Sequence, residues 1–74
     1  MRKPTVYLDT SFISAYWYEG NDIAMAARRL HTREWWDMER QHFSVWASEF
    51  TEGELRAGTY PRQSDCVKMV KRLR

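Results

Sequence analysis

Two short runs of strand-forming residues, far apart in the sequence, constrain the fold of this chain most strongly. Residues 4–8 are nearly continuously apolar, as expected for a strand that is covered on both faces. Residues 42–47 alternate, with Phe43, Val45 and Ala47 on one side and polar or aromatic residues on the other. The runs are too far apart for a hairpin, so the sequence predicts a parallel pair joined by a crossover connection.

The residues between these strands favour two helices. Residues 11–18 suit a short helix that Thr10 or Ser11 caps. A longer helix is predicted from residue 22 to about residue 40, with Asn21 as N-cap. Its buried face is expected to carry an imperfect apolar stripe of Ile23, Ala27, Leu30, Trp35 or Trp36, and Met38.

Two further helices are predicted after the second strand. One begins near Ser48 and ends at Gly58, the residue type favoured just beyond a helix end. Pro61 can open the last helix. An apolar stripe follows it at helical spacing: Cys66, Met69, Val70 and Leu73. The predicted order is β-α-α-β-α-α, so the fold class is α/β with a short parallel sheet.

Composition restricts the protein class. The chain has 74 residues, of which 43% are hydrophobic and 30% are charged, so it is predicted to form one globular domain. No apolar run approaches the ~20 residues that span a bilayer, and the N-terminus turns polar early. Cys66 is the only cysteine, which excludes an internal disulfide and is typical of a reducing compartment. We therefore expect a cytoplasmic protein in which Cys66 is a small buried residue.

Basic residues gather in the last quarter of the chain: Arg56, Arg62, Lys68, Lys71, Arg72 and Arg74. Such a cluster can contact phosphate groups. It can equally form a solvated helix face, and from charge alone the second interpretation is favoured.

Two carboxylates occupy positions that suit a metal-binding site. Asp9 ends the first strand, and ligands of open parallel α/β folds bind at the carboxyl ends of strands. Its oxygens would suit Mg²⁺ or Mn²⁺, but the same side chain could simply cap the next helix. Glu54 follows the second strand. It could complete a capping box with Thr51, which is a purely structural role.

Three motifs in order resemble the PIN-domain nucleases, and among them the VapC-type toxins of toxin–antitoxin pairs. VYLDTSFISAY, residues 6–16, resembles the opening strand, acid and Thr-Ser pair of that family. TREWWDMERQHFSVWASEF, residues 32–50, is similar to a helix-to-strand segment of one toxin subgroup. The pattern S-x-x-T-x-x-E-L-x-x-G, residues 48–58, resembles the segment with the second acid. The resemblance covers essentially the whole chain.

The resemblance implies a three-layer α/β/α fold and a divalent-metal-dependent endoribonuclease. Asp9 matches the first metal-binding acid, Glu54 the second, and Ser11 a small polar position beside the first. A carboxylate-held Mg²⁺ or Mn²⁺ can activate water and stabilise the negative charge of phosphodiester hydrolysis. Glu49 and Glu52 match no acid of the family, so both are expected to be surface charges.

Further acids of the family lie beyond its third strand, and they have no counterpart before Arg74. The resemblance therefore implies that residues 1–74 correspond to a single partial PIN-like domain, its N-terminal half. With two acids we expect weak metal binding and impaired cleavage. The alternative function is a non-catalytic fragment that self-associates or binds the cognate antitoxin.

The resemblance also implies two partners, an RNA substrate and an antitoxin that lies in an apolar groove of the N-terminal helices. Five aromatic residues could line that groove, although ordinary packing is expected for at least half of them: Tyr16, Trp17, Tyr18, Trp35 and Trp36. Base stacking on exposed rings is the weaker alternative, because these aromatics are not interleaved with basic residues in the sequence.

A homo-oligomer is the third partner prediction. A two-strand sheet is expected to leave apolar surface uncovered, and exposed edges and apolar faces favour pairing with another chain. The residues expected to remain uncovered are Val6, Leu8, Phe43, Val45 and the Cys66–Leu73 stripe.

Overall fold

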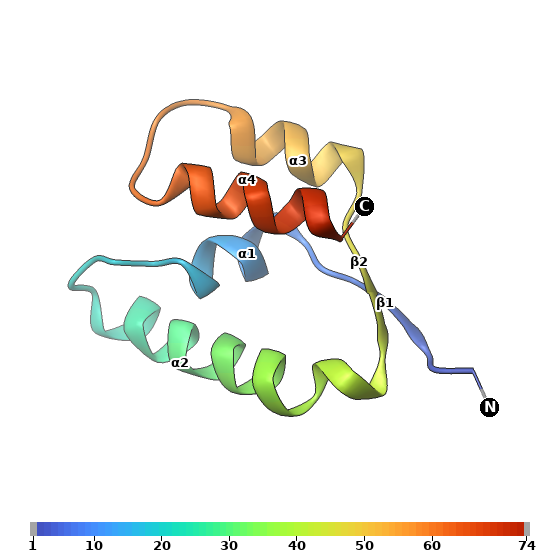
Figure 1. The fold of residues 1–74 in the computed structure, drawn as a ribbon. Helices are drawn as coiled ribbons and strands as arrows, with labels where there is room; N and C mark the ends of the chain where they lie inside the picture. Colours follow the sequence, from blue (N-terminus) through green and yellow to red (C-terminus); the bar gives the residue numbers. More distant parts are fainter. Residues whose placement is uncertain (1, 74) are drawn as a thin grey trace.

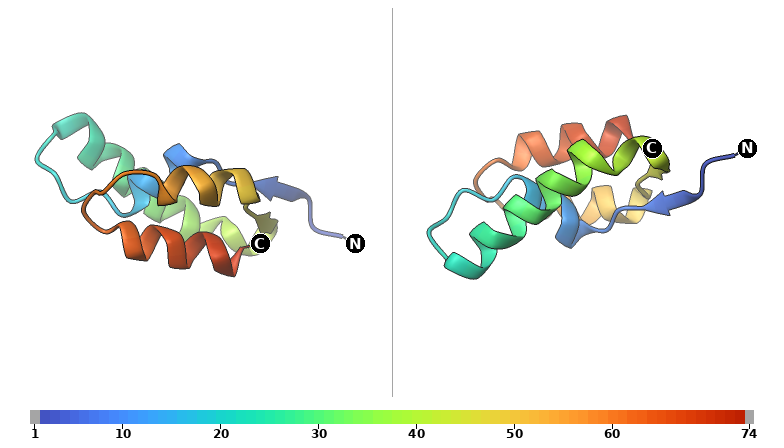
Figure 2. Two further views of the ribbon diagram at one scale, coloured as in Figure 1. Left: turned by 90° about the horizontal axis from the view of Figure 1, so that it is seen from above. Right: turned by 90° about the horizontal axis from the view of Figure 1, so that it is seen from below.

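The computed structural model describes residues 2–73 and is of mixed α/β class (Figure 1). Helix α1 lies between α2 on one side and the α3–α4 pair on the other, while the strands lie at one edge (Figures 1 and 2). None of the helices within residues 2–73 has the length and hydropathy of a membrane span. The elements in chain order are β1 (Thr5–Tyr7), α1 (Thr10–Tyr16), α2 (Ile23–Met38), the 3₁₀ helix η1 (Arg40–His42), β2 (Ser44–Trp46), α3 (Glu49–Arg56) and α4 (Gln63–Arg72).

The two strands pair in parallel, as the sequence predicts, but each is shorter than expected. The register pairs Thr5 with Ser44, Val6 with Val45 and Tyr7 with Trp46. Two hydrogen bonds extend the pairing, from the Ser44 N–H to the Pro4 carbonyl (2.8 Å) and from the Leu8 N–H to the Trp46 carbonyl (2.9 Å). His42, the first residue of the predicted second strand, belongs to η1 instead, and Phe43 lies between η1 and β2.

Aspartates cap the first two helices, which confirms the capping alternative for Asp9 and corrects the other predicted caps, Thr10 or Ser11 for α1 and Asn21 for α2. Asp9, not Thr10 or Ser11, is the N-cap of α1, and its carboxylate accepts the Phe12 N–H at 3.0 Å. Asp22, not Asn21, caps α2 by accepting the Met25 N–H at 2.8 Å. All of these residue types suit an N-cap, but a carboxylate also gains from the positive end of the helix dipole.

Cap and turn residues set both ends of α3 and the start of α4. Ser48 is the N-cap of α3, because its hydroxyl accepts the Thr51 N–H at 3.1 Å. Thr51 therefore lies inside the helix and does not form a capping box with Glu54. Gly58 follows the helix end with φ +70°, as predicted for this position. Helix α4 begins at Gln63, two residues after Pro61, because the chain first turns through Arg62 at φ 63°.

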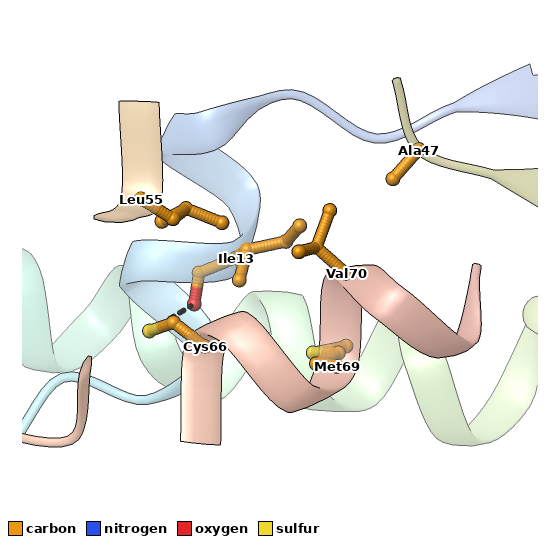
Figure 3. Packing of buried hydrophobic residues seen from close by; sticks show 6 residues of the cluster. All are labelled: Ile13, Ala47, Leu55, Cys66, Met69 and Val70. Carbon is orange, nitrogen blue, oxygen red and sulfur yellow. Dashed lines mark hydrogen bonds between the residues drawn. The ribbon is translucent and has the colours of Figure 1, made fainter. Parts of the chain in front are cut away.

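The core joins α1, α3 and α4. Ile13, Leu55, Cys66 and Val70 are its fully buried side chains, and Figure 3 shows Ile13 between the other three. Met69 and Ala47 complete the cluster. The apolar stripe of the last helix is thus confirmed as a core face. The expectation that this stripe stays uncovered is wrong, because α1 and α3 of the same chain cover it.

Cys66 is buried, as predicted, with 1% of its surface exposed. Its thiol donates weakly to the Ile13 carbonyl, with 4.0 Å between sulfur and oxygen (Figure 3). Burial raises the pKa of the Cys66 thiol because the thiolate would lose its hydration. The residue therefore acts as an apolar packing group between α1 and α4.

Most of the predicted stripe of α2 points outward, which contradicts the sequence-based expectation, whereas Trp35 and Trp36 near its end are half-buried and pack on Phe12 and Tyr16. The helix has no buried residue, and Ile23, Leu30 and Met38 are 87%, 58% and 67% exposed. Its other face binds α1 through two guanidinium groups: Arg29 donates to the Tyr18 carbonyl and Arg33 to the Tyr16 carbonyl, both at 2.9 Å. The Tyr16 carbonyl ends α1 and the Tyr18 carbonyl lies just beyond it, so the two arginines hold this face of α2 against the end of α1.

Candidate functional site

Asp9 lies where β1 leads into α1, and its side chain is exposed. One oxygen, Oδ1, accepts both the Ser11 hydroxyl at 2.8 Å and the Phe12 N–H at 3.0 Å. The Phe12 N–H most strongly lowers the pKa of the Asp9 carboxyl, followed by the Ser11 hydroxyl, and the positive charge of Arg28 on α2 adds to them. Asp9 is therefore ionised at neutral pH and held in one orientation at the helix start.

Glu54 comes from the middle of α3, with its side chain exposed. Its Oε1 accepts the hydroxyl of Thr10, the residue directly after Asp9. The packing of α1 against α3 supports this contact. Both predicted acids thus lie at the start of α1, joined through the Thr10 side chain.

Thr10 is the contribution that the sequence did not reveal. The sequence predicts it only as a possible cap of α1, whereas it is the first residue of α1 and its hydroxyl orients Glu54. Ser11 contacts Asp9 directly, in the supporting position that its sequence match implies. In the sequence, only the position of Thr10 next to an acid at a strand end could indicate this role. A hydroxyl at such a position is usually interpreted as a helix cap.

Glu52 is not the surface charge that was expected. Its side chain is only 12% exposed, and its Oε2 accepts the Arg56 Nε–H at 2.8 Å. The pair spans one turn of α3 at i and i+4, a spacing at which opposite charges meet. Glu49, in the first turn of the same helix, is exposed.

The donor set fits a hard divalent cation in part. Asp9 and Glu54 offer carboxylate oxygens, which Mg²⁺ and Mn²⁺ prefer, and Mg²⁺ retains several waters. Each acid uses one oxygen for hydrogen bonds within the chain, Oδ1 of Asp9 and Oε1 of Glu54. Within residues 2–73, no group of three or more His, Cys, Asp or Glu side chains is placed to hold a metal ion. The pair is thus suited to weak binding of a hydrated ion.

A second feature is a cavity of about 390 Å³ at the far end of α1. It is lined by Tyr16, Trp17, Trp36, Asp65, Lys68, Met69 and Arg72. Trp17 donates its indole N–H to the Met69 sulfur at 3.3 Å. Of the other aromatics predicted for a groove, Tyr18 lines a separate cavity of about 230 Å³. Trp35 packs on Phe12 and Phe43, with centroids 5.6 and 5.7 Å away.

Basic and aromatic residues meet around the cavity of about 390 Å³. The guanidinium carbon of Arg33 lies 4.8 Å from the Tyr16 ring centroid, and that of Arg40 lies 4.6 Å from Trp36. Arg62 lies 4.7 Å from Trp17 and also pairs with Glu19 (2.7 Å) and Asp65 (2.5 Å). The basic cluster is therefore not uniform, since Arg62 is bound within the chain whereas Lys68 and Arg72 line the cavity.

Comparison of the chain with known protein families, curated proteins and solved structures finds no match. The resemblance to PIN-domain nucleases therefore depends on the three motifs of the chain itself. The α/β class of the structure and the contact of Glu54 with the residue after Asp9 are compatible with that resemblance.

Proposed function

We propose that the chain is a divalent-metal-dependent endoribonuclease of the PIN and VapC type, a partial PIN-like domain that acts in the cytoplasm. The observation that carries this proposal is the hydrogen bond from Thr10 to Glu54. It ties the acid on α3 to the residue beside Asp9, which supports a common site for the two acids that match the family motifs. Neither helix alone would bring them together.

Asp9 and Glu54 would hold a Mg²⁺ or Mn²⁺ ion. The ion would supply a water of lowered pKa and a positive charge beside the phosphate that is cleaved. The chain's own residues orient the site: the Phe12 N–H and the Ser11 hydroxyl fix Asp9, and Thr10 fixes Glu54. With only two carboxylates the ion is held weakly, so slow turnover is expected.

The proposal is tested by incubating an end-labelled structured RNA with the purified chain in Mn²⁺, in Mg²⁺ and in EDTA. We expect slow internal cleavage that needs either metal and stops in EDTA. In parallel, Mn²⁺ titration followed by NMR should broaden the amide signals of residues 9–12 and 54 before others. Cleavage in EDTA, or broadening centred elsewhere, would contradict the assignment.

The second candidate function is binding of a cognate antitoxin without catalysis, and the larger cavity is the observation that favours it. The cavity combines aromatic walls, Tyr16, Trp17 and Trp36, with the cations Lys68 and Arg72. Such a surface suits an apolar side chain flanked by acidic residues. Self-association stays a separate prediction, and the residues that would now carry it are the exposed Ile23, Leu30 and Met38 of α2.

This candidate predicts that Trp36→Ala weakens binding of the cognate antitoxin protein at least about 30-fold, as for a central aromatic anchor. Isothermal titration calorimetry with that protein measures the effect. Phe50→Ala is the control, because Phe50 is 75% exposed and does not line the cavity. Equal losses in both variants, or no binding by the unmodified chain, would reject the candidate.

A further inference from the structure

The face of the sheet that points away from the core carries two exposed rings. Side chains alternate along a strand, and Leu8 and Ala47 are buried, so Tyr7 and Trp46 point to the opposite face. They are register partners on adjacent parallel strands and are 67% and 44% exposed. Strand spacing of ~4.8 Å places the two side chains next to each other on this face. The Trp46 indole N–H donates to the Ser44 hydroxyl at 2.8 Å, which fixes that ring.

Tyr7 and Trp46 have open ring faces, as does the isolated Phe50 on α3, whereas the aromatic side chains around α1 are covered. Tyr16, Trp17 and Trp36 contact one another or lie under guanidinium groups. Trp35 packs between Phe12 and Phe43. Among the described residues 2–73, Tyr7 and Trp46 enter no ring–ring or cation–ring contact. They can therefore accept a planar group without displacing a side chain.

The exposed face leads directly to the candidate metal site. Asp9 follows Tyr7 by two residues of extended chain, so both side chains project on the same side. Exposed Arg2 and Lys3 precede β1 at the other end of the strand. The face thus has cations at one end, two rings in the middle and the acid pair at its carboxyl end.

We infer that Tyr7 and Trp46 form a stacking platform for two unpaired bases of single-stranded RNA, next to Asp9 and Glu54. Aromatic side chains on a sheet stack bases that are not paired, and cations beside them attract the phosphates. This inference rests on the proposed function for the identity of the nucleic acid, and it specifies the substrate as single-stranded at the site. Tyr7 and Trp46 are positioning residues, since they hold the strand beside the acids.

A second copy of the chain is the less suitable occupant. Tyr and Trp present about 150–250 Å² each, so at these exposures the two rings offer roughly 250 Å². A stable protein interface needs about 800 Å² per partner. The face is large enough for two bases but too small for a dimer.

The test is the affinity for a labelled ten-nucleotide uridine RNA, measured by fluorescence anisotropy in EDTA at fixed salt. Tyr7→Ala and Trp46→Ala should each raise Kd roughly 5- to 150-fold, the range for one lost base–aromatic contact. Tyr7→Phe and Trp46→Phe keep a ring and should stay within about threefold of the unmodified chain. Met38→Ala is the control, because Met38 has the same 67% exposure as Tyr7 but lies on α2.

Several results would overturn the inference. These are equal affinity in the alanine variants and the unmodified chain, equal affinity for an abasic oligomer or a duplex, and no binding by the unmodified chain. Loss of a dimer in light scattering in both alanine variants, with RNA affinity unchanged, would assign the face to a second copy instead. Because EDTA removes the metal, RNA affinity in this assay reports on the platform, whereas metal-dependent cleavage reports on Asp9 and Glu54. The platform and the nuclease proposal can therefore fail independently.

Discussion

Leu55→Ala is expected to remove a large share of the free energy of unfolding at 25 °C. Leu55 is 1% exposed and packs at the junction of α1, α3 and α4 (Figure 3). Removing a buried leucine side chain costs about 2–5 kcal/mol. A chain of this length has about 4–11 kcal/mol of stability at ~0.05–0.15 kcal/mol per residue. The urea midpoint, followed by far-UV circular dichroism, should fall steeply or the transition should lose its folded baseline.

Leu30→Ala is the matched control, since it makes the same chemical change on the outer face of α2. Leu30 is 58% exposed, and a surface change of this kind is worth about 0.5 kcal/mol or less. The two urea midpoints should therefore differ clearly. Equal midpoints would mean that the core does not lie between α1, α3 and α4.

Asp9→Asn is expected to lower Mn²⁺-dependent RNA cleavage by at least about 10²-fold, the scale of a ~1 Å displacement of reacting groups. Asparagine caps helices about as well as aspartate, so the start of α1 should be preserved. The change therefore removes the negative charge that would hold the ion while keeping the local fold. Initial rates of cleavage across a Mn²⁺ titration measure the loss.

Asp22→Asn is the control, because it makes the same substitution at the N-cap of α2 and should leave cleavage unchanged. Asp9→Ala should lose both functions of the side chain, with cleavage lowered as in Asp9→Asn and stability reduced by about 0.5–2 kcal/mol. Normal cleavage by Asp9→Asn would leave Asp9 as a helix cap alone.

Patterns of hydrophobic residues predict the parts of the fold that are held by the burial of apolar side chains. The parallel strands, the element order and the Cys66–Val70 face of α4 follow from such patterns and agree with the structure. Helix α3 also ends just before Gly58, as predicted, because few residue types other than glycine adopt the left-handed backbone conformation that follows the helix.

Polar contacts over long sequence separations decide the rest. The apolar stripe of α2 predicts a core face. Nothing in the local sequence indicates that Arg29 and Arg33 instead turn the opposite face of α2 toward the carbonyls near the end of α1. For the same reason, Thr10 was read as a cap although it bonds Glu54, 44 residues away. Motifs in the sequence identify Asp9 and Glu54 as candidates. The hydrogen bond of Thr10 with Glu54 depends on how α1 and α3 pack, which the motifs do not indicate.

The burial of Ile13 against Cys66 and Val70 has a consequence during synthesis. Residues 13 and 66 contact each other across 53 positions of sequence, so most of the chain must leave the ribosome before Ile13 is covered. Until then α1 presents its apolar face to chaperones, proteases and other nascent chains. Closing a loop of this length also costs conformational entropy before the contact forms. The chain is therefore expected to acquire protease resistance in a single late step, when α4 emerges, rather than strand by strand.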